Sequence, residues 1–500
     1  MENTQNKKGG FASGIGFILA AAGSAVGLGN LWAFPYKTAE NGGAAFVFLY
    51  ILCVLLIGAV TMICEIFLGR RAQANPISAY KKINKNLGWI GLIAIVVPTI
   101  IVCYYSVLGG YTVKFATNSF AGNTGNLGVF AGKSWQVILF TAIFMILALI
   151  VVMAGVKGGI EKASKILMPA LFVLLVAVVV FVLCLGEGVK DGLAYYLIPD
   201  FSKITFGSVL AAMGQAFYSL SLGMGSMIVY GSYTNKEINI VKSTAMVCVF
   251  DTFVALLAGL AIFPAVFHFS AVEGIDTSTL DLNGIMLMFE TLPKVFESIG
   301  FLGKVIEFFF FAMVSIAAVT SVISIMEVAS QFVIQKFKIS RKIAAAIIAG
   351  VTFVVSIPVS ISLGYLLSGT AQMTVFGLDW LSFLDTVTNT VFMPICAFLS
   401  CVSVGWFIGS KQALYELKAD GNNFGKLETF IGIMMKYIVP ALIAVIEIFG
   451  VMDLIFPAGA FSANGLGVVL VSYALFGLLI AVYFLFIRNT ETGTNADELV

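Results

Sequence analysis

Charged residues and histidine are scarce in this sequence. Asp, Glu, Lys and Arg make up 11% of the 500 residues, and 60% are hydrophobic. Soluble proteins carry about 25% charged residues, so an ordinary soluble protein is excluded. The net charge of +2 gives no reason to expect a nucleic-acid partner. The lone histidine, His268, has no second His or Cys beside it, which argues against a metal site there.

Cysteine pairs and soluble segments are also lacking. The seven cysteines all fall inside hydrophobic stretches and show no zinc-type spacing, so we expect small buried side chains and no disulfide. They are Cys53, Cys64, Cys103, Cys184, Cys248, Cys396 and Cys401. We find no linker and no soluble domain. The longest polar stretch is the tail 488–500, which we expect to be a disordered cytoplasmic tail.

Long hydrophobic stretches are abundant instead. A membrane-spanning helix needs about 20 apolar residues, and the sequence predicts twelve spans: about 12–38, 42–68, 88–119, 136–155, 166–185, 206–233, 241–269, 301–334, 342–358, 383–408, 429–452 and 464–487. If the N-terminus is cytoplasmic, most of the 28 Lys and Arg residues fall in cytoplasmic segments. We therefore predict a multi-pass protein of the cell (inner or plasma) membrane with both termini in the cytoplasm.

Two of these spans are interrupted near their middle. The first contains Gly23-Ser24-Ala25-Val26-Gly27-Leu28-Gly29-Asn30, and the sixth contains Ser219-Leu220-Ser221-Leu222-Gly223-Met224-Gly225. Glycine costs a helix about 1 kcal/mol relative to alanine, and lipid offers no water to unpaired backbone groups. Broken membrane helices mark substrate and ion sites at the midplane of secondary transporters. The two breaks therefore predict such a site.

The position of the breaks predicts an internal repeat. Spans 1–5 and 6–10 each begin with an interrupted helix, and five is odd, so the second set must be inverted. We expect one transporter domain over 1–487, with repeats at about 12–185 and 206–408 and peripheral helices at about 429–487. Within the outer loop 270–300, the amphipathic piece 285–293 either caps the outer vestibule or lies as an interfacial helix.

Asp251 is a carboxylate within a predicted span. Such a group is costly in a membrane and marks a functional site by default. Its neighbours, Val247-Cys248-Val249-Phe250 and Thr252-Phe253, provide no cation. A bound sodium ion would supply the missing positive charge. A protonation cycle of Asp251 that drives proton antiport stays open.

Several motifs together resemble the neurotransmitter:sodium symporter family, in its prokaryotic amino-acid-transporting branch. The resemblance covers spans 1–10 and implies an all-α LeuT-type fold, with a 5+5 inverted repeat and two peripheral helices. It also implies sodium-coupled uptake of an amino acid by alternating access. The matching motifs are Gly23–Tyr36, Glu40-Asn41-Gly42-Gly43, Glu65–Arg71, Tyr104-Tyr105, Gly214–Gly225 and Thr320-Ser321.

The resemblance implies two sodium sites. The first takes the carbonyl of Ala25, the side chains of Asn30, Ser219 and Asp251, and the carboxylate of the substrate. The second takes the carbonyls of Gly23, Val26 and Ala317 and the hydroxyls of Thr320 and Ser321. Alternatively, these two hydroxyls bond back to carbonyls of their own helix. Many relatives have Asn at the Asp251 position and use chloride as the counter-charge, so we expect no chloride requirement.

The resemblance also implies a substrate pocket. Relatives that carry amines have an aspartate where this chain has Gly27, so the expected substrate is an amino acid. The side-chain subsite holds no acidic or basic residue, which leaves a charged side chain unpaired, and Met224 adapts to bulky groups. We therefore expect a neutral, hydrophobic or aromatic substrate. The pocket residues are Ser24, Ala25, Leu28, Gly29, Ile101, Tyr105, Tyr218, Ser219, Ser221, Met224, Ser321 and Ile325.

The chain departs from the family at its gates. An outer arginine–aspartate pair is replaced by Ala33 and Thr388, and an inner pair by Lys8 and Gln335. The resemblance makes Glu65 a support for the unwound segments and leaves Glu327 without a role. A channel would need a continuous polar pore and an enzyme a catalytic set, and neither is evident. A transporter-derived amino-acid sensor without turnover is the alternative to transport, and the lost gate pairs mildly favour it.

Overall fold

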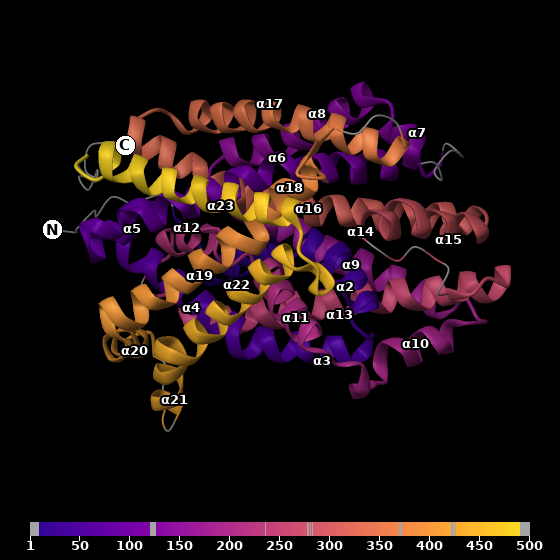
Figure 1. Cartoon of the computed structure of the whole chain (residues 1–500), viewed down its shortest axis with the longest axis horizontal. Helices are drawn as coiled ribbons and strands as arrows, with labels where there is room; N and C mark the ends of the chain where they lie inside the picture. The colour runs from indigo at the N-terminus through magenta and orange to yellow at the C-terminus, as the bar shows by residue number, and fades with distance from the viewer. Residues whose placement is uncertain are drawn as a thin grey trace.

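The structure is a computed structural model that describes residues 10–120, 127–235, 237–277, 280, 282, 284–369, 373–421, 425 and 427–490. Its described elements are helices apart from one hairpin of two-residue strands, β1 (Thr374–Val375) and β2 (Leu378–Asp379). Most long helices run side by side along the horizontal axis of Figure 1, and the described part of the chain begins and ends on its left side. We call this side the terminal end of the bundle.

Among the residues that the structure describes, ten helical segments are long and apolar enough to cross a membrane. An eleventh span is a pair, α1 (Gly14–Ala25) followed by η1 (Gly29–Ala33) and α2 (Phe34–Glu40), bent by 48°. The ten are Ala44–Ala72 (α3, η2, α4), Lys85–Asn118 (η3, α6), Ser134–Met153 (α8), Val156–Leu183 (η4, α9), Ile240–Glu273 (α13), Phe301–Phe337 (α16), Arg341–Ser368 (α17), Trp380–Lys418 (α18, η8, α19, η9, α20), Glu428–Ile455 (α21, η10, α22) and Ala463–Ile487 (α23, η12).

The sixth predicted span, 206–233, is not a continuous helix. It consists of α11 (Phe206–Ser219) and α12 (Ser226–Ser232), both shorter than the roughly 20 residues that a span needs. Among the described residues, ten long helices and the bent pair are long enough to span, and the interruption that the sequence predicts for the sixth span is present. The physical reason is the backbone of the connecting segment, where Ser221, Gly223 and Gly225 have φ of 54°, 75° and 69°.

Gly223 also has no room for a side chain. A Cβ placed there would lie 2.2 Å from the carbonyl oxygen of Met393. The close approach of the broken segment to α19 (Met393–Val402) therefore requires glycine at this position.

Burial separates inner from outer helices. The most apolar windows of the spans that contain α6 (Gly88–Asn118) and α16 (Phe301–Phe337) are each 72% buried, against 22% for the span that contains α23 (Ala463–Val482). α1 packs against α9 (Lys162–Leu183), α13 and α16. The two broken helices thus lie inside a shell of helices whose outer faces are apolar, as contact with lipid requires.

The loop segment 285–293 is helical and packs on the bundle. It falls in α14 (Gly284–Met286), η7 (Leu287–Thr291) and α15 (Leu292–Ser298), at the end of the bundle opposite the terminal end (Figure 1). Phe289 stacks on Phe311 at a centroid distance of 5.9 Å. α14 contacts η1 of the first broken helix. These contacts favour a cap over the break rather than a peripheral interfacial helix.

Candidate functional site

The two broken helices are tied to each other at their breaks. The first has an extended residue, Val26, with φ −70° and ψ 107° after α1 ends. From the second broken helix, Gln215 Nε2 donates to the Gly29 carbonyl at 2.7 Å and Ser221 Oγ donates to the Ser24 carbonyl at 2.7 Å. Backbone groups left over by the break are therefore satisfied by side chains of its counterpart.

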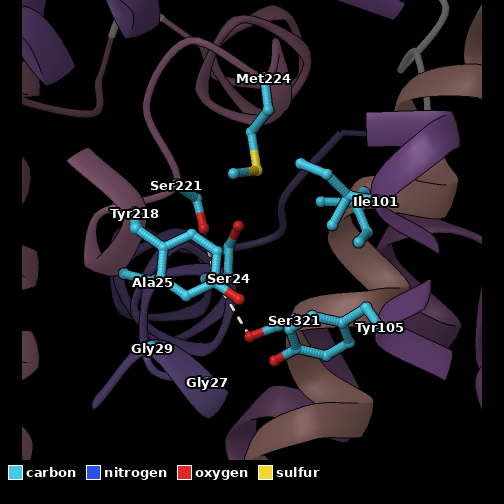
Figure 2. A pocket seen from close by; sticks show the side chains of 11 residues that line it. Ser24, Ala25, Gly27, Gly29, Ile101, Tyr105, Tyr218, Ser221, Met224 and Ser321 are labelled. Carbon is cyan, nitrogen blue, oxygen red and sulfur yellow. Dashed lines mark hydrogen bonds between the residues drawn. The ribbon is translucent and has the colours of Figure 1, made fainter. Parts of the chain in front are cut away.

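A small pocket lies between the breaks (Figure 2). It leaves about 20 Å³ for the centres of water-sized spheres. Met224 points into it from one side, with Ile101 and Tyr218 on either flank (Figure 2). The described residues that line it are Ser24, Ala25, Gly27, Gly29, Ile101, Tyr105, Tyr218, Ser221, Met224, Ser321 and Ile325. Every predicted substrate residue except Leu28 and Ser219 is therefore on its wall.

Gly27 lines the pocket although it was not among the predicted lining residues. A Cβ there would lie 2.4 Å from Ser321 Oγ and 2.6 Å from the Tyr105 hydroxyl. The sequence pattern could have identified Gly27 as a pocket residue, because relatives that carry amines have an aspartate at this position. An aspartate at this position would require the Ser321 and Tyr105 hydroxyls to move.

The pocket has a polar and an apolar end. The Leu28 N–H donates to the Tyr105 hydroxyl at 2.9 Å, although Leu28 itself does not line the pocket. Ser24 Oγ donates at 2.7 Å to Ser324 Oγ, and Ser324 donates to the Ser321 carbonyl. Ser324 therefore fixes the Ser24 hydroxyl, a role that the sequence analysis missed. The apolar end is formed by the side chains of Ile101, Met224 and Ile325.

Asp251 lies at the centre of a buried polar cluster. Its Oδ2 accepts hydrogen bonds from Ser219 Oγ at 2.7 Å and from the Tyr50 hydroxyl at 3.1 Å. Its Oδ1 accepts from Asn30 Nδ2 at 2.8 Å, while Asn30 Oδ1 accepts from the Gly27 N–H at 3.0 Å. None of the ion pairs among the described residues involves Asp251.

The structure thus brings together the three side chains predicted for the first sodium site, with Ala25 on the adjoining pocket wall. Tyr50 is a further member that the sequence analysis did not include. The Asp251 carboxylate and the Ser219 and Tyr50 hydroxyls are hard oxygen donors of the kind that hard metal ions prefer, whereas Asn30 turns its Nδ2 toward Asp251 and its Oδ1 toward Gly27.

The residues of the second predicted sodium site also meet. Ser321 Oγ lies 3.4 Å from the Gly23 carbonyl and 3.2 Å from the Val26 carbonyl across the helix interface. Thr320 Oγ1 instead donates to the Ala317 carbonyl at 3.0 Å and to the Ile316 carbonyl at 3.2 Å. The back-bonding alternative therefore holds for Thr320, whereas Ser321 reaches from α16 to α1.

Glu65 supports the second break. It lies on α4 (Ala59–Ala72), is buried, and its Oε1 accepts a hydrogen bond from the Gly223 N–H at 2.8 Å. This is the contact to the sixth span that the resemblance implied. It pairs a backbone donor that the break leaves free.

A second cavity shares Tyr218 with the pocket and leaves about 310 Å³ for the centres of water-sized spheres. Ala33 lines it as expected for the outer gate position. From Ala33 and Thr388 alone, both gate charges are expected to be lost. Two charged residues, Lys37 and Asp385, line the cavity instead. They lie about one helical turn from Ala33 and Thr388 in the sequence. Thr388 is turned away and donates to the Leu384 carbonyl at 2.8 Å.

The inner gate positions are also engaged differently. Gln335 Oε1 accepts hydrogen bonds from the N–H and the Nδ2 of Asn75, at 3.1 and 2.6 Å. Lys8 lies outside the described residues. Glu327, left without a role by the sequence, pairs with Arg341 at 2.7 Å and accepts a hydrogen bond from the Tyr233 hydroxyl at 2.5 Å.

Comparison with known proteins agrees with this geometry. The model of the sodium:neurotransmitter symporter family matches residues 8–126 and 125–490. The uncharacterized sodium-dependent transporter YhdH of Bacillus subtilis is 36% identical over 448 residues, covering 87% of this chain and 96% of the relative. The human neutral and basic amino acid transporter B(0+), described as sodium- and chloride-dependent, is 24% identical over 493 residues, covering 83% of this chain and 75% of the relative.

A solved structure is similar as well. The crystal structure of MhsT in complex with L-phenylalanine superposes with a TM-score of 0.79 at 35% identity, covering 89% of this chain and 100% of that one. The helices, the two breaks and the family match lead to one conclusion: the chain belongs to the sodium:neurotransmitter symporter family and is an all-α, multi-pass membrane protein with the LeuT-type fold.

Proposed function

We propose that the protein is a secondary active transporter that takes up a neutral, hydrophobic or aromatic amino acid together with sodium by alternating access. The observation that carries the proposal is the pocket between the two breaks, polar at one end and apolar at the other, beside the Asp251 cluster. The similarity to MhsT, solved with L-phenylalanine, supports it.

The polar end suits the main-chain groups of an amino acid. The Tyr105 hydroxyl lines the pocket and can donate to a carboxylate, while its oxygen accepts from the Leu28 N–H at 2.9 Å. The ammonium group can meet backbone carbonyls freed near Ala25 and Tyr218, while the side chain lies against Met224. The described lining residues include no acidic or basic side chain, so a charged substrate side chain would be buried without a partner.

Two sodium ions are the proposed co-substrates. One is held by Asp251, Asn30, Ser219 and the Ala25 carbonyl, beside the substrate carboxylate, so that ion and substrate bind together. Since Asp251 supplies the negative charge, transport needs no chloride in this proposal.

The other sodium ion is held by Ala317, Thr320, Ser321 and the carbonyls of Gly23 and Val26. It joins α1 to α16, and its occupancy can therefore shift the balance between the states open to either side.

The terminal end of the bundle is the proposed cytoplasmic side. Arg70 and Arg71 lie in the last turn of α4. Lys81 and Lys82 lie in α5 (Pro76–Ile83), which is at the terminal end in Figure 1. Cytoplasmic segments of membrane proteins are enriched in such residues.

Thermal unfolding of the purified protein tests the proposal. Each of the twenty amino acids is added in sodium and, separately, in potassium. A ligand that binds the native state alone raises the melting temperature by mass action. We expect stabilisation by a few apolar amino acids in sodium only. The absence of sodium-dependent stabilisation by any amino acid would contradict the proposed pocket.

Counterflow in reconstituted vesicles separates a transporter from a sensor. Vesicles loaded with an unlabelled stabilising amino acid should accumulate the labelled form transiently. Binding without counterflow would identify an amino-acid sensor that has lost turnover.

A further inference from the structure

Glu161 is a buried carboxylate that the proposed transport site does not use. It ends the π-helical turn η4 (Val156–Glu161), directly before α9. Its side chain is 2% exposed. A carboxylate is seldom buried unless its oxygens are paired, so its partners indicate what it does.

Glu161 binds the start of the first broken helix, about 150 positions away in the sequence. Its Oε2 accepts a hydrogen bond from the Ala12 N–H at 2.7 Å, and its Oε1 accepts one from Ser13 Oγ at 3.2 Å. Ser13 is also the N-cap of α1, because its Oγ accepts from the Gly16 N–H at 3.0 Å. Lys165, one turn along α9, completes the set at 2.6 Å.

The two helices meet here without spare room. A Cβ at Gly16 would lie 2.1 Å from Glu161 Oε1. The carboxylate therefore rests against the first turn of α1, where it pairs donors that the helix start leaves free and opposes the positive end of the helix dipole. The hydrogen bonds to Ala12 and Ser13 and the negative charge of Glu161 therefore both stabilise the packing of α1 against α9.

This contact can control the state of the transporter because α1 is only half a span. α1 ends at Ala25 and η1 begins at Gly29, so residues 26–28 can act as a hinge. Any opening of the pocket at the terminal end that tilts α1 away from α9 breaks the Ala12 and Ser13 contacts. It leaves Glu161 with Lys165 as its remaining partner among these groups.

The inner gate pair typical of the family is not available for this task, since Gln335 is neutral and is bonded to Asn75. We infer that Glu161 is the positioning residue that latches the first half of the broken helix to α9 and holds the pocket closed at the terminal end. The inference rests on the proposed alternating-access cycle and assigns Glu161 a gating role within it.

Thiol labelling tests the latch. Ala21 is fully buried in α1, so the thiol introduced by Ala21→Cys reports departure of the whole half-helix. The full-length protein in sodium, without amino acid, is treated with a maleimide, and labelling at position 21 is quantified by mass spectrometry. We expect Glu161→Ala to raise the labelling rate roughly tenfold, the order expected for losing a hydrogen bond to a charged group. Glu161→Asp should give a smaller increase.

Two control variants separate the latch from other roles. Lys165→Gln removes the other partner of the carboxylate but not its link to α1. Glu428→Gln removes the acid of a second Glu–Lys pair, Lys418–Glu428, at 2.7 Å and outside the segment that caps the break. Both should leave labelling at position 21 unchanged. If Glu161→Ala unfolds the protein, Glu161→Gln, which keeps the size of the side chain and one acceptor oxygen, takes its place.

Unchanged labelling in folded Glu161→Ala or Glu161→Gln protein would overturn the inference. So would an increase confined to hydrogen exchange of the first-turn amides 12–16, because that pattern reports local fraying only. Neither result touches the sodium-dependent stabilisation by amino acids, so a failed latch and a failed transport proposal are distinguishable.

Discussion

At the scale of single residues, the proposal for this site rests mainly on Asp251 and Gly27. Asp251 brings a negative charge into a cluster of Asn30, Ser219 and Tyr50. Gly27 leaves the space that the Ser321 and Tyr105 hydroxyls fill. In the proposed transport site, Asp251 supplies the negative charge that holds the cation, and Gly27 leaves no carboxylate to pair with an amine.

Replacing the charge of Asp251 should change the ion requirement. We predict that Asp251→Asn lowers sodium affinity roughly tenfold or more, because a charge-assisted contact is lost. Uptake by the variant should then be greater in chloride than in gluconate, whereas the native protein should not distinguish the two anions.

Radiolabelled uptake in proteoliposomes measures this difference. Glu447→Gln is the matched control, since Glu447 contacts Tyr473 between α22 (Val439–Ile455) and α23, away from the Asp251 cluster. Native uptake that collapses in gluconate would refute the assignment of Asp251 as the built-in counter-charge.

At the scale of elements, the second broken helix depends on a glycine-containing connection. Gly223 combines a φ of 75° with a 2.2 Å approach to the Met393 carbonyl, and its N–H donates to Glu65. The break is therefore held from α4 on one side and from α19 on the other. This arrangement positions Ser221 and Met224 against the pocket.

Gly223→Ala should disrupt this connection. The left-handed backbone alone costs a non-glycine residue about 1–2 kcal/mol, and the contact with Met393 adds to that. We predict a lower melting temperature and at least a tenfold loss of amino-acid affinity. Gly214→Ala in α11 is the control, because no heavy atom outside its own helix lies within 4 Å of the added Cβ. It should leave both quantities unchanged, and equal effects of the two variants would count against a built-in break.

At the scale of the whole molecule, the arrangement is a polar centre within an apolar shell. The two half-helix pairs bring their unpaired backbone groups to the middle of the bundle, where protein surrounds them. The spans around α6 and α16 are the most buried, and those around α22 and α23 the least. The terminal end carries α5 and α20 (Ser410–Lys418), and the opposite end carries α14 and α15 (Figure 1).

The orientation of this bundle leads to a labelling prediction. In intact cells, a membrane-impermeant maleimide should modify a thiol introduced by Glu297→Cys, which is exposed on α15. It should not modify one introduced by Asn86→Cys, which is exposed at the terminal end before α6. Both are made with Cys184→Ser, because Cys184 is exposed, and that variant alone gives the background. The opposite pattern would place the terminal end outside.

The sequence by itself determined the class of the molecule and most of its pocket. Length and hydropathy predict membrane spans because lipid requires long apolar helices, and clustered glycines predict breaks because they weaken a helix locally. The resemblance to the family then implied the pocket residues, because they stand at matching positions of the shared motifs. Ser24, Ala25, Tyr218 and Met224 are examples.

Only the tertiary structure decided which distant side chains complete these local features. Tyr50 joins Asp251, Ser324 fixes Ser24, and Glu161 binds Ala12 through contacts between residues far apart in the chain. Lys37 and Asp385 meet in one cavity from different helices, although the aligned gate positions are neutral. Such partners depend on how helices pack, and hydrophobic periodicity and composition carry no information about which polar groups face each other across that packing.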